Sequence, residues 1–298
     1  DETAWDVNQS ALFDAIYSGD LAQVKELLLA FPHLRDTQFP GHIGANPLSL
    51  AAHCGHLNIV EILVSNGARV DAMTKDGVTP LMCAARRGNF YVAEALCLLG
   101  AKPDFNNPLT GESALLCAVG NKQFDTCKLL IMMGASIDLM LEIREQNGLT
   151  TLLTPLSVAI SGDFTDLIKW LIDTRKIHVD WIESSTNHTI LNLAARYGAL
   201  RLIRLLLELG ANMNMETPIP DNVGSLKNIW NVVTYYARPD SAELLSSLLY
   251  RDKNETASCY LKRETSFEFW AVLDVIAHTP PLEEIKLPAD GLYEPELR

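Results

Sequence analysis

Residues 79–101 read TPLMCAARRGNFYVAEALCLLGA, and residues 46–68 read NPLSLAAHCGHLNIVEILVSNGA. The leucine after the shared proline is Leu48 in one stretch and Leu81 in the other, 33 positions apart. Weaker copies place this leucine at Leu12, Leu115, Leu156 and Leu191, so the steps are 36, 33, 34, 41 and 35 residues. Self-similarity at a period of about 20–50 residues is the signature of a repeat architecture.

Each copy carries the signals of two short helices separated by a tight turn. In the copy at 79–101, Thr79 can cap the first helix, and Pro80 occupies the first helical position, where its missing N–H costs nothing. Gly88 suits the left-handed turn that ends this helix, and a second apolar helix follows from Val92 to Leu99. One unit cannot bury its apolar faces alone, so the units must stack. The sequence therefore predicts an all-α repeat solenoid with a projecting turn or hairpin between units.

The recurring pattern resembles the ankyrin family, whose repeat reads Gly-x-Thr-Pro-Leu, then Ala-Ala-x-x-Gly, an apolar Leu-Leu helix and Gly-Ala. The chain matches it over about residues 8–214, at Gly77-Val78-Thr79-Pro80-Leu81, Gly55-His56, Gly67-Ala68, Gly134-Ala135, Ala194-Ala195 and Gly210-Ala211. This joint recurrence is very specific, whereas a single match would be weak. The resemblance implies an ankyrin stack of about six to seven repeats with a helical C-terminal cap.

We expect four segments along the chain. Residues 1–43 would form an N-terminal capping repeat, and residues 44–214 repeats two to six, with an insertion near 139–151. Residues 215–278 would hold a degenerate seventh repeat and a terminal helix that caps the stack. Residues 279–298 contain four prolines and would form an extended acidic tail. A loose terminus is favoured for this tail over a peptide that docks on a partner.

Two copies lack the glycine that ends the first helix. Lys122 stands at this position in the fourth copy and Asp163 in the fifth. Glycine is the residue that adopts a left-handed conformation without steric cost. We therefore expect these two turns to be strained or reshaped.

The charge of the chain argues against nucleic acids and anionic membranes as partners. Its 298 residues include 24 basic and 37 acidic side chains, a net charge of -13, which repels phosphates and anionic head groups. No apolar run approaches the ~20 residues that span a bilayer, so membrane insertion is not expected. The six cysteines form no CxxC pair, which indicates reduced cysteine in the cytoplasm. The start at Asp1 leaves the earlier removal of a signal open.

The patterns that catalysis or metal binding would need are missing from the sequence. His53 and His56 invite a metal site, but His56 stands at the Gly-His position of the repeat, where the histidine supports the turn. The sequence has no phosphate-binding glycine loop and no Gly-x-Ser-x-Gly motif, and its carboxylates are scattered. We therefore expect no catalytic residue, no cofactor and no metal, and a chain that is not an enzyme.

The ankyrin resemblance implies that a protein partner binds the concave side, formed by the projecting turns and the first helices. Each layer there presents variable side chains on a rigid frame, which limits the ordering cost of binding. Arginine and tyrosine are enriched at binding hot spots. The strongest candidates are therefore Arg86, Arg87, Arg196 and Tyr197, with Tyr91 in support. The predicted contact set also includes Lys75, Asp76, Glu112 and His188, of which the histidine is expected to be solvated.

The 41-residue step between Leu115 and Leu156 adds about seven residues around 139–151. Insertions in repeat proteins map to loops, often on the binding face. Leu141 and Ile143 are apolar in a region that should project into water. We hypothesise that this segment is a finger that contacts the partner; the alternative is that it folds back on the stack.

The sequence thus predicts a non-catalytic protein–protein interaction module, an adaptor or scaffold that binds an unidentified protein as a monomer. One alternative is a regulatory inhibitor that blocks an enzyme or a transcription factor. Another is a secreted bacterial effector acting in the host cytoplasm, for which the acidic end with Glu283, Glu284, Glu294 and Glu296 is a weak signal. An enzyme carried on the C-terminal third is the remaining alternative.

Overall fold

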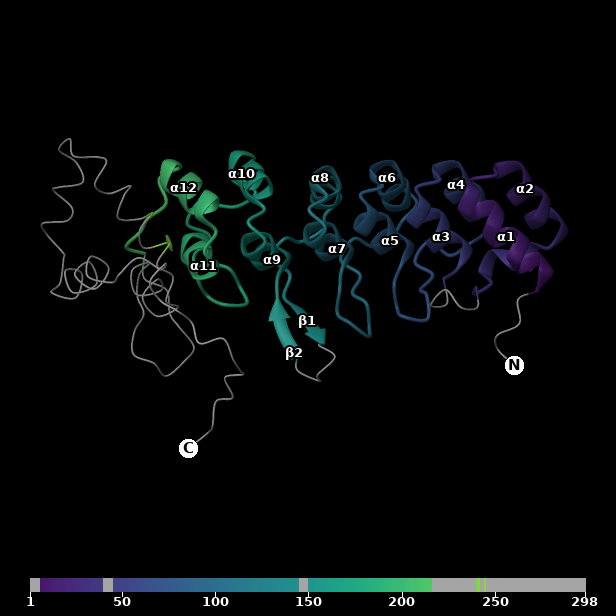
Figure 1. Ribbon diagram of the computed structural model, residues 1–298, viewed down its shortest axis with the longest axis horizontal. Coiled ribbons are helices and arrows are strands. Elements are labelled where there is room, and N and C mark those ends of the chain that lie inside the picture. Colours follow the sequence, from purple (N-terminus) through teal and green to yellow (C-terminus); the bar gives the residue numbers. More distant parts are fainter. Residues whose placement is uncertain (1–5, 40–44, 145–149, 216–239, 242–243, 245–298) are drawn as a thin grey trace, which may run out of the picture. The chain divides into compact units, whose positions relative to one another are not determined.

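The computed structural model describes residues 6–39, 45–144, 150–215, 240–241 and 244. The chain divides into two compact units, Asp1–Val232 and Val233–Arg298. The helices and strands described below belong to the first unit. Within its described residues, helix pairs follow one another along the chain, as the repeats predict (Figure 1). The expected all-α repeat solenoid is therefore confirmed.

The first helices of successive pairs pack on one another and form the lower row of Figure 1. These inner helices are α1 (Val7–Ser18), α3 (Pro47–Cys54), α5 (Pro80–Arg87), α7 (Ala114–Gly120), α9 (Pro155–Ser161) and α11 (Ile190–Tyr197). The second helices form the upper row and also pack on one another. These outer helices are α2 (Leu21–Ala30), α4 (Leu57–Ser65), α6 (Phe90–Leu98), α8 (Phe124–Met132), α10 (Thr165–Asp173) and α12 (Leu200–Glu208). A 3-10 helix, η1 (Pro32–Asp36), follows α2. We call each pair with its preceding turn a layer, numbered one to six.

The inner helices begin and end where the sequence places caps. A side chain accepts the backbone N–H three residues later at the start of five of them, namely Asn46, Thr79, Ser113, Thr154 and Thr189. Gly88 has φ 73°, and Lys122 and Asp163 hold the same position in their layers with φ 53° and 50°. The strain expected at these two turns is thus present as left-handed backbone at non-glycine residues.

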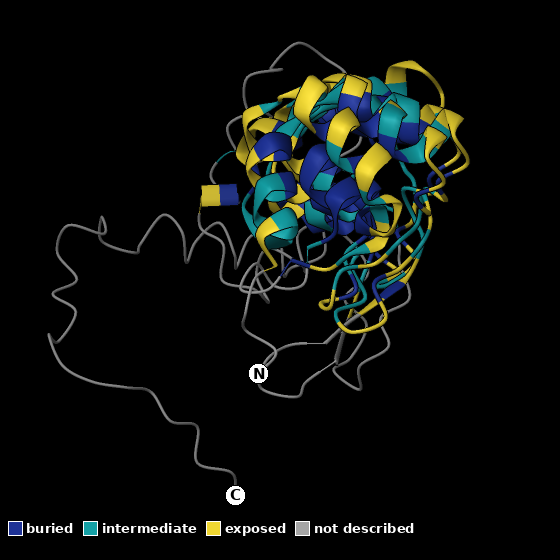
Figure 2. Cartoon of the chain, turned by 90° about the vertical axis from the view of Figure 1, so that its right-hand side faces the viewer, coloured by how far each residue is buried: buried dark blue, intermediate teal, exposed yellow. Residues whose placement is uncertain are grey.

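The core lies between the two rows of helices (Figure 2). The six leucines that define the repeat are between 0% and 1% exposed. The alanine pairs are fully buried at Ala51-Ala52, Ala84-Ala85 and Ala194-Ala195, which lets neighbouring inner helices approach closely.

Aspartates join the bases of successive hairpins. Asp71, Asp104 and Asp180 each accept a backbone N–H from the next layer, at Lys102 (3.4 Å), Ser136 (2.9 Å) and Asn212 (2.7 Å). Asp138 departs from this pattern, because it instead accepts the N–H and the hydroxyl of Ser184, at 3.2 Å and 2.5 Å.

The predicted insertion contains two antiparallel strands, β1 (Leu141–Arg144) and β2 (Thr150–Leu153). Their register pairs Leu141 with Leu153 and Arg144 with Thr150, so the hairpin of the fifth layer is longer than its neighbours (Figure 1). The predicted seventh repeat and cap at 215–278 lie outside the described residues apart from Met215, Asp240, Ser241 and Leu244, and the tail at 279–298 lies wholly outside them. In the part of the chain that the structure describes, no helix combines the length and apolar character needed to cross a membrane.

Candidate functional site

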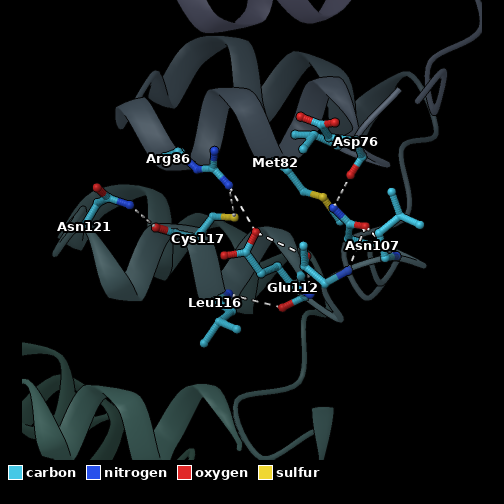
Figure 3. A network of polar contacts seen from close by, with 12 residues as sticks. Asp76, Met82, Arg86, Asn107, Glu112, Leu116, Cys117 and Asn121 are labelled. Atoms are coloured by element: carbon cyan, nitrogen blue, oxygen red, sulfur yellow. Dashed lines mark hydrogen bonds and ion pairs between the residues drawn. The ribbon is translucent and has the colours of Figure 1, made fainter. Parts of the chain in front are cut away.

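We use the term inner surface for the hairpins together with the carboxyl ends of the inner helices. Arg86, at the end of α5, donates from Nη2 to Oε2 of Glu112 at 3.2 Å, and the same nitrogen lies 3.8 Å from Sγ of Cys117 in α7 (Figure 3). Thr110 donates its hydroxyl to the same carboxylate oxygen at 3.4 Å. Two predicted contact residues, Arg86 and Glu112, thus meet across the third and fourth layers.

Asn107 connects the third and fourth hairpins through side-chain hydrogen bonds. Its Nδ2 donates to the carbonyl of Asp76 at 2.8 Å, and its Oδ1 accepts the N–H groups of Leu109 and Thr110 at 2.8 Å and 3.2 Å (Figure 3). The side chains of Asp76 and the neighbouring Lys75 are exposed. These predicted residues therefore lie on a hairpin that its neighbour holds rigidly.

A basic cluster lies where α3 and α5 end, and it consists of His53, Arg86 and Arg87. Partial burial and the positive charges of Arg87 and Arg86 lower the pKa of His53. A histidine repelled by two guanidinium groups stays neutral at pH 7, so the two arginines provide the positive charge of the cluster.

Arg196 and Tyr197 form a second group at the end of α11. The guanidinium of Arg196 lies over the Tyr197 ring, 5.6 Å from its centroid. Both side chains are half-buried. The predicted hot-spot residues are therefore divided between the third and sixth layers.

The structure separates Tyr91 from the inner surface. Tyr91 follows the turn at Gly88 and lies in the outer helix α6, where it is exposed together with Leu98 of α6 and Met132 of α8. Tyr91 thus belongs to the outer row, whereas Arg86 and Arg87 end an inner helix, and its support of the arginines stays a prediction. The reason for this separation is topological, since every residue after the left-handed turn belongs to an outer helix.

The predicted finger presents different residues from those expected. Leu141 is fully buried, so it stabilises the hairpin base and is not a free contact. Ile143 pairs with Thr151 between the two strands, and the structure describes the backbone of Ile143 but not its side chain. Met140 and Leu152 are the exposed apolar residues of this segment. The alternation of strand side chains between two faces is the signal that distinguishes Met140 from Leu141.

His188 is buried rather than solvated as expected. Its Nδ1 lies 2.8 Å from the carbonyl of Thr186, so this nitrogen carries the proton, and burial lowers the pKa of His188. Among the described residues, its Nε2 has no hydrogen-bond partner. The turn that follows Glu183 folds His188 inward, because the Glu183 N–H donates to the His188 carbonyl at 2.9 Å. His188 therefore shapes the sixth hairpin and presents no contact surface.

Glu183 is a structural residue that sequence reasoning missed. Its buried carboxylate accepts the Thr154 hydroxyl at 2.5 Å, the Ser185 hydroxyl at 2.8 Å, and the Thr186 N–H and hydroxyl at 2.9 Å and 2.8 Å. Burial alone would raise the pKa of Glu183, but these hydrogen bonds outweigh it and lower that pKa. Glu183 thus ties the cap of α9 to the sixth hairpin.

Four successive hairpins each expose a large apolar side chain. We call this set the apolar row, and it consists of Met73, Leu109, Met140, Leu152 and Ile182. Patches of exposed apolar side chains are typical of contact sites, and these five lie in hairpins that follow one another along the chain. The apolar row lies in layers three to six, the layers that also hold the two groups of predicted arginines.

The described residues have little that would support catalysis. Burial raises the pKa of Cys83 and Cys127 to about 12 and that of Cys97 and Cys117 to about 11, so these thiols stay protonated near neutral pH. In the same part of the chain, no group of three His, Cys, Asp or Glu residues could hold a metal ion.

A cavity of about 400 Å³ lies at the second and third layers, and its lining includes Met73 but none of the predicted contact residues. Its charged lining includes Arg35, Asp36, Arg69 and Asp71. Arg35 donates to the carboxylate of Asp36 at 3.0 Å and to the carbonyl of Asn66 at 2.7 Å. Asp71 accepts the Lys102 N–H. Most of these groups are therefore engaged within the fold.

Comparisons with known proteins agree with this architecture. A family model described as ankyrin repeats, in three copies, matches residues 12–107 and 139–217. The crystal structure of the human ASB11 ankyrin repeat domain is similar with a TM-score of 0.55 and 25% identity, covering 76% of this chain and 96% of that domain.

Two curated relatives show how much of a longer protein the chain corresponds to. The ankyrin repeat and KH domain-containing protein mask-1 of Caenorhabditis elegans is 30% identical over 70% of this chain and 7% of its own length. The E3 ubiquitin-protein ligase XBAT33 of Arabidopsis thaliana is 28% identical over 69% of this chain and 37% of its own length. The chain thus spans less than two fifths of either relative.

Proposed function

This chain belongs to the ankyrin-repeat family, and on that premise we propose that it is an adaptor whose inner surface binds a protein partner. Ankyrin repeats are a protein–protein interaction module, but the fold leaves the partner open, because function resides in the variable surface. We propose that the apolar row provides the contact area and that the arginines of α5 and α11 provide specificity.

The apolar row is the observation that carries this proposal. Its members lie on hairpins that side-chain hydrogen bonds tie to their neighbours, as Asn107 does for the third and fourth hairpins. A preorganised surface loses little conformational freedom when it binds. Apolar side chains held rigidly in water are costly unless a partner covers them.

We further propose that the chain itself is not catalytic and acts as a monomer in the cytoplasm. Burial raises the pKa of Cys83 and Cys117, so these thiols stay protonated near neutral pH, and the repeats bury their core within one chain. The described cysteines are free, which suits a reducing compartment. A protein is favoured over nucleic acid because the chain carries a net charge of -13.

The test is affinity capture with two matched triple variants. Met73→Ser with Leu109→Ser and Ile182→Ser removes three apolar side chains from the inner surface. Tyr91→Ser with Leu98→Ser and Met132→Ser removes three from the outer helices, where these side chains are at least as exposed. Both variants are first compared with the native chain for thermal unfolding.

We expect the native chain and the outer-helix variant to capture the same protein and the inner-surface variant to lose it. Loss from the outer-helix variant alone would move the binding surface to α6 and α8. Equal capture by all three chains would overturn the proposal for the apolar row.

A further inference from the structure

Five of the six inner helices, taken together, carry a charge opposite to that of the whole chain. Helices α3, α5, α7, α9 and α11 contain Arg86, Arg87 and Arg196 but no aspartate or glutamate. The chain as a whole has 37 acidic and 24 basic residues. The ends of α5 and α11 are therefore two positive groups in an acidic protein, and each attracts negative groups.

The positive charge lies in two groups with a neutral stretch between them. Arg86 and Arg87 end α5, and Arg196 lies near the end of α11. Helices α7 and α9 intervene and end at the small, exposed residues Gly120 and Ser161. Small side chains here leave room for a backbone to lie between the two groups.

The turns that follow the helices add one further charge of each sign. The stem of Lys122 lies against Gly162, since a Cβ on that glycine would be 3.9 Å from the Lys122 Cε. Asp163, the acidic residue of these turns, accepts the Thr165 hydroxyl at 2.9 Å. The net charge between the two groups is therefore close to zero.

Arg87 has its charge available for a ligand. Its side chain is exposed, and it makes no hydrogen bond or ion pair with the part of the chain that the structure describes. Arg86 already forms an ion pair with Glu112, so Arg87 is the stronger anchor for an anionic ligand. A cation near a helix C-terminus is favoured by the helix dipole, but this effect alone does not explain why α7 and α9 carry none.

The separation of the two groups fixes the length of ligand that could reach both. Successive inner helices pack in contact, at about 8–10 Å between axes. Three such steps from α5 to α11 give roughly 24–30 Å. An extended chain rises about 3.3 Å per residue, so about eight residues span this distance.

We propose that the inner surface binds an extended acidic peptide segment of a partner protein, with carboxylates about eight residues apart on Arg87 and Arg196. This inference rests on the proposed function and adds the chemistry of the partner. A peptide fits better than a nucleic acid, because the neighbouring apolar row would contact apolar side chains, which a sugar–phosphate backbone lacks.

The test uses defined peptides, fluorescence anisotropy and low salt, about 50 mM, where charge pairing is least screened. The long probe has two glutamates at each end and six glycine or serine residues between them. The short probe has the same charge with two residues between the pairs, and a ten-nucleotide oligothymidylate tests for general anion binding. Arg87→Glu and Arg196→Glu are compared with Arg201→Glu, a matched charge reversal on the outer helix α12.

We expect the long probe to bind at least about tenfold more tightly than the short one. Arg87→Glu and Arg196→Glu should each remove this advantage, and Arg201→Glu should retain it. Equal affinity for both peptides, equal or tighter binding of the oligonucleotide, or the absence of binding would overturn the inference. The peptide experiment can fail while the inner-surface serine variant still loses its captured protein. In that event, the proposed function stands and only the acidic-peptide inference is overturned.

Discussion

Gln123 occupies the space that a side chain at Gly88 would need: its Oε1 is the nearest atom to the position of a Cβ on that glycine. The ring of His56 stands in the same relationship to Gly19, and the amide of Asn89 to Gly55. In each case the residue after one layer's left-handed turn reaches back to the turn of the layer before. A glycine is therefore required for two reasons: its backbone is left-handed, and a side chain of the next layer fills the space that a Cβ would need.

Replacing Gly88 with alanine should lower the free energy of unfolding by about 2–4 kcal/mol, through left-handed strain and overpacking. Gly100→Ala is the matched control, because Gly100 has φ 97° but no atom within 4 Å of its Cβ position. The control should cost less, about 1–2 kcal/mol. Urea unfolding measures both variants. Gln123→Ala should partly rescue Gly88→Ala, and an equal cost at the two glycines would contradict the contact.

The buried carboxylate of Glu183 should make the protein less stable in acid. Its pKa is lowered in the folded state from the usual 4.5, so its contribution is present above pH 4.5 and is lost as the pH falls through the folded pKa. Glu183→Gln should cost about 1–3 kcal/mol at pH 7, because the glutamine nitrogen cannot accept the surrounding hydrogen bonds. The difference in free energy of unfolding between the native chain and the variant, measured in urea, should become smaller below pH 4.5. An equal difference in free energy of unfolding at pH 7 and pH 3 would argue against a stabilising role of the ionised Glu183 carboxylate.

The sequence was sufficient for the repeat because its signals are local. Thr79, Pro80 and Gly88 specify the start and end of α5 within a single copy. The left-handed backbone at Lys122 and Asp163 could also be anticipated, since position in the repeat dictates it. In the layers that follow Lys122 and Asp163, the residue after the left-handed turn is Phe164 and Ala199, respectively. The other layers have His56, Asn89 or Gln123 at this position.

The contacts of the hairpins could not be predicted in this way. Glu183 and His188 look like polar turn residues, and their burial depends on how the fifth and sixth hairpins pack. Leu141 and Met140 are adjacent in sequence, so which of them is buried depends on strand register. Arg86 and Glu112 were both predicted as contact residues, but their ion pair depends on the packing of two layers.

His188 should titrate below the pH expected for a free histidine. Burial lowers its pKa from 6.5 in the folded state, so protonation favours unfolding and stability is lost as the pH falls from 6.5 through the folded pKa. An NMR titration of the imidazole resonances should show the low midpoint. In His188→Gln, the loss of stability as the pH falls below 6.5 should be reduced. A midpoint at or above 6.5 would contradict the buried neutral ring.

The long hairpin of the fifth layer should depend on Leu141 for stability and on Met140 for contacts. Leu141 is fully buried, so Leu141→Ala should lower the free energy of unfolding by about 2–5 kcal/mol. Met140 is 45% exposed, so Met140→Ala should change it by less than about 0.5 kcal/mol. Urea unfolding compares the two variants. If Met140→Ala weakens capture of the partner while Leu141→Ala weakens folding, the hairpin has two faces with separate roles; equal stability of the two variants would show that Leu141 is not part of the core.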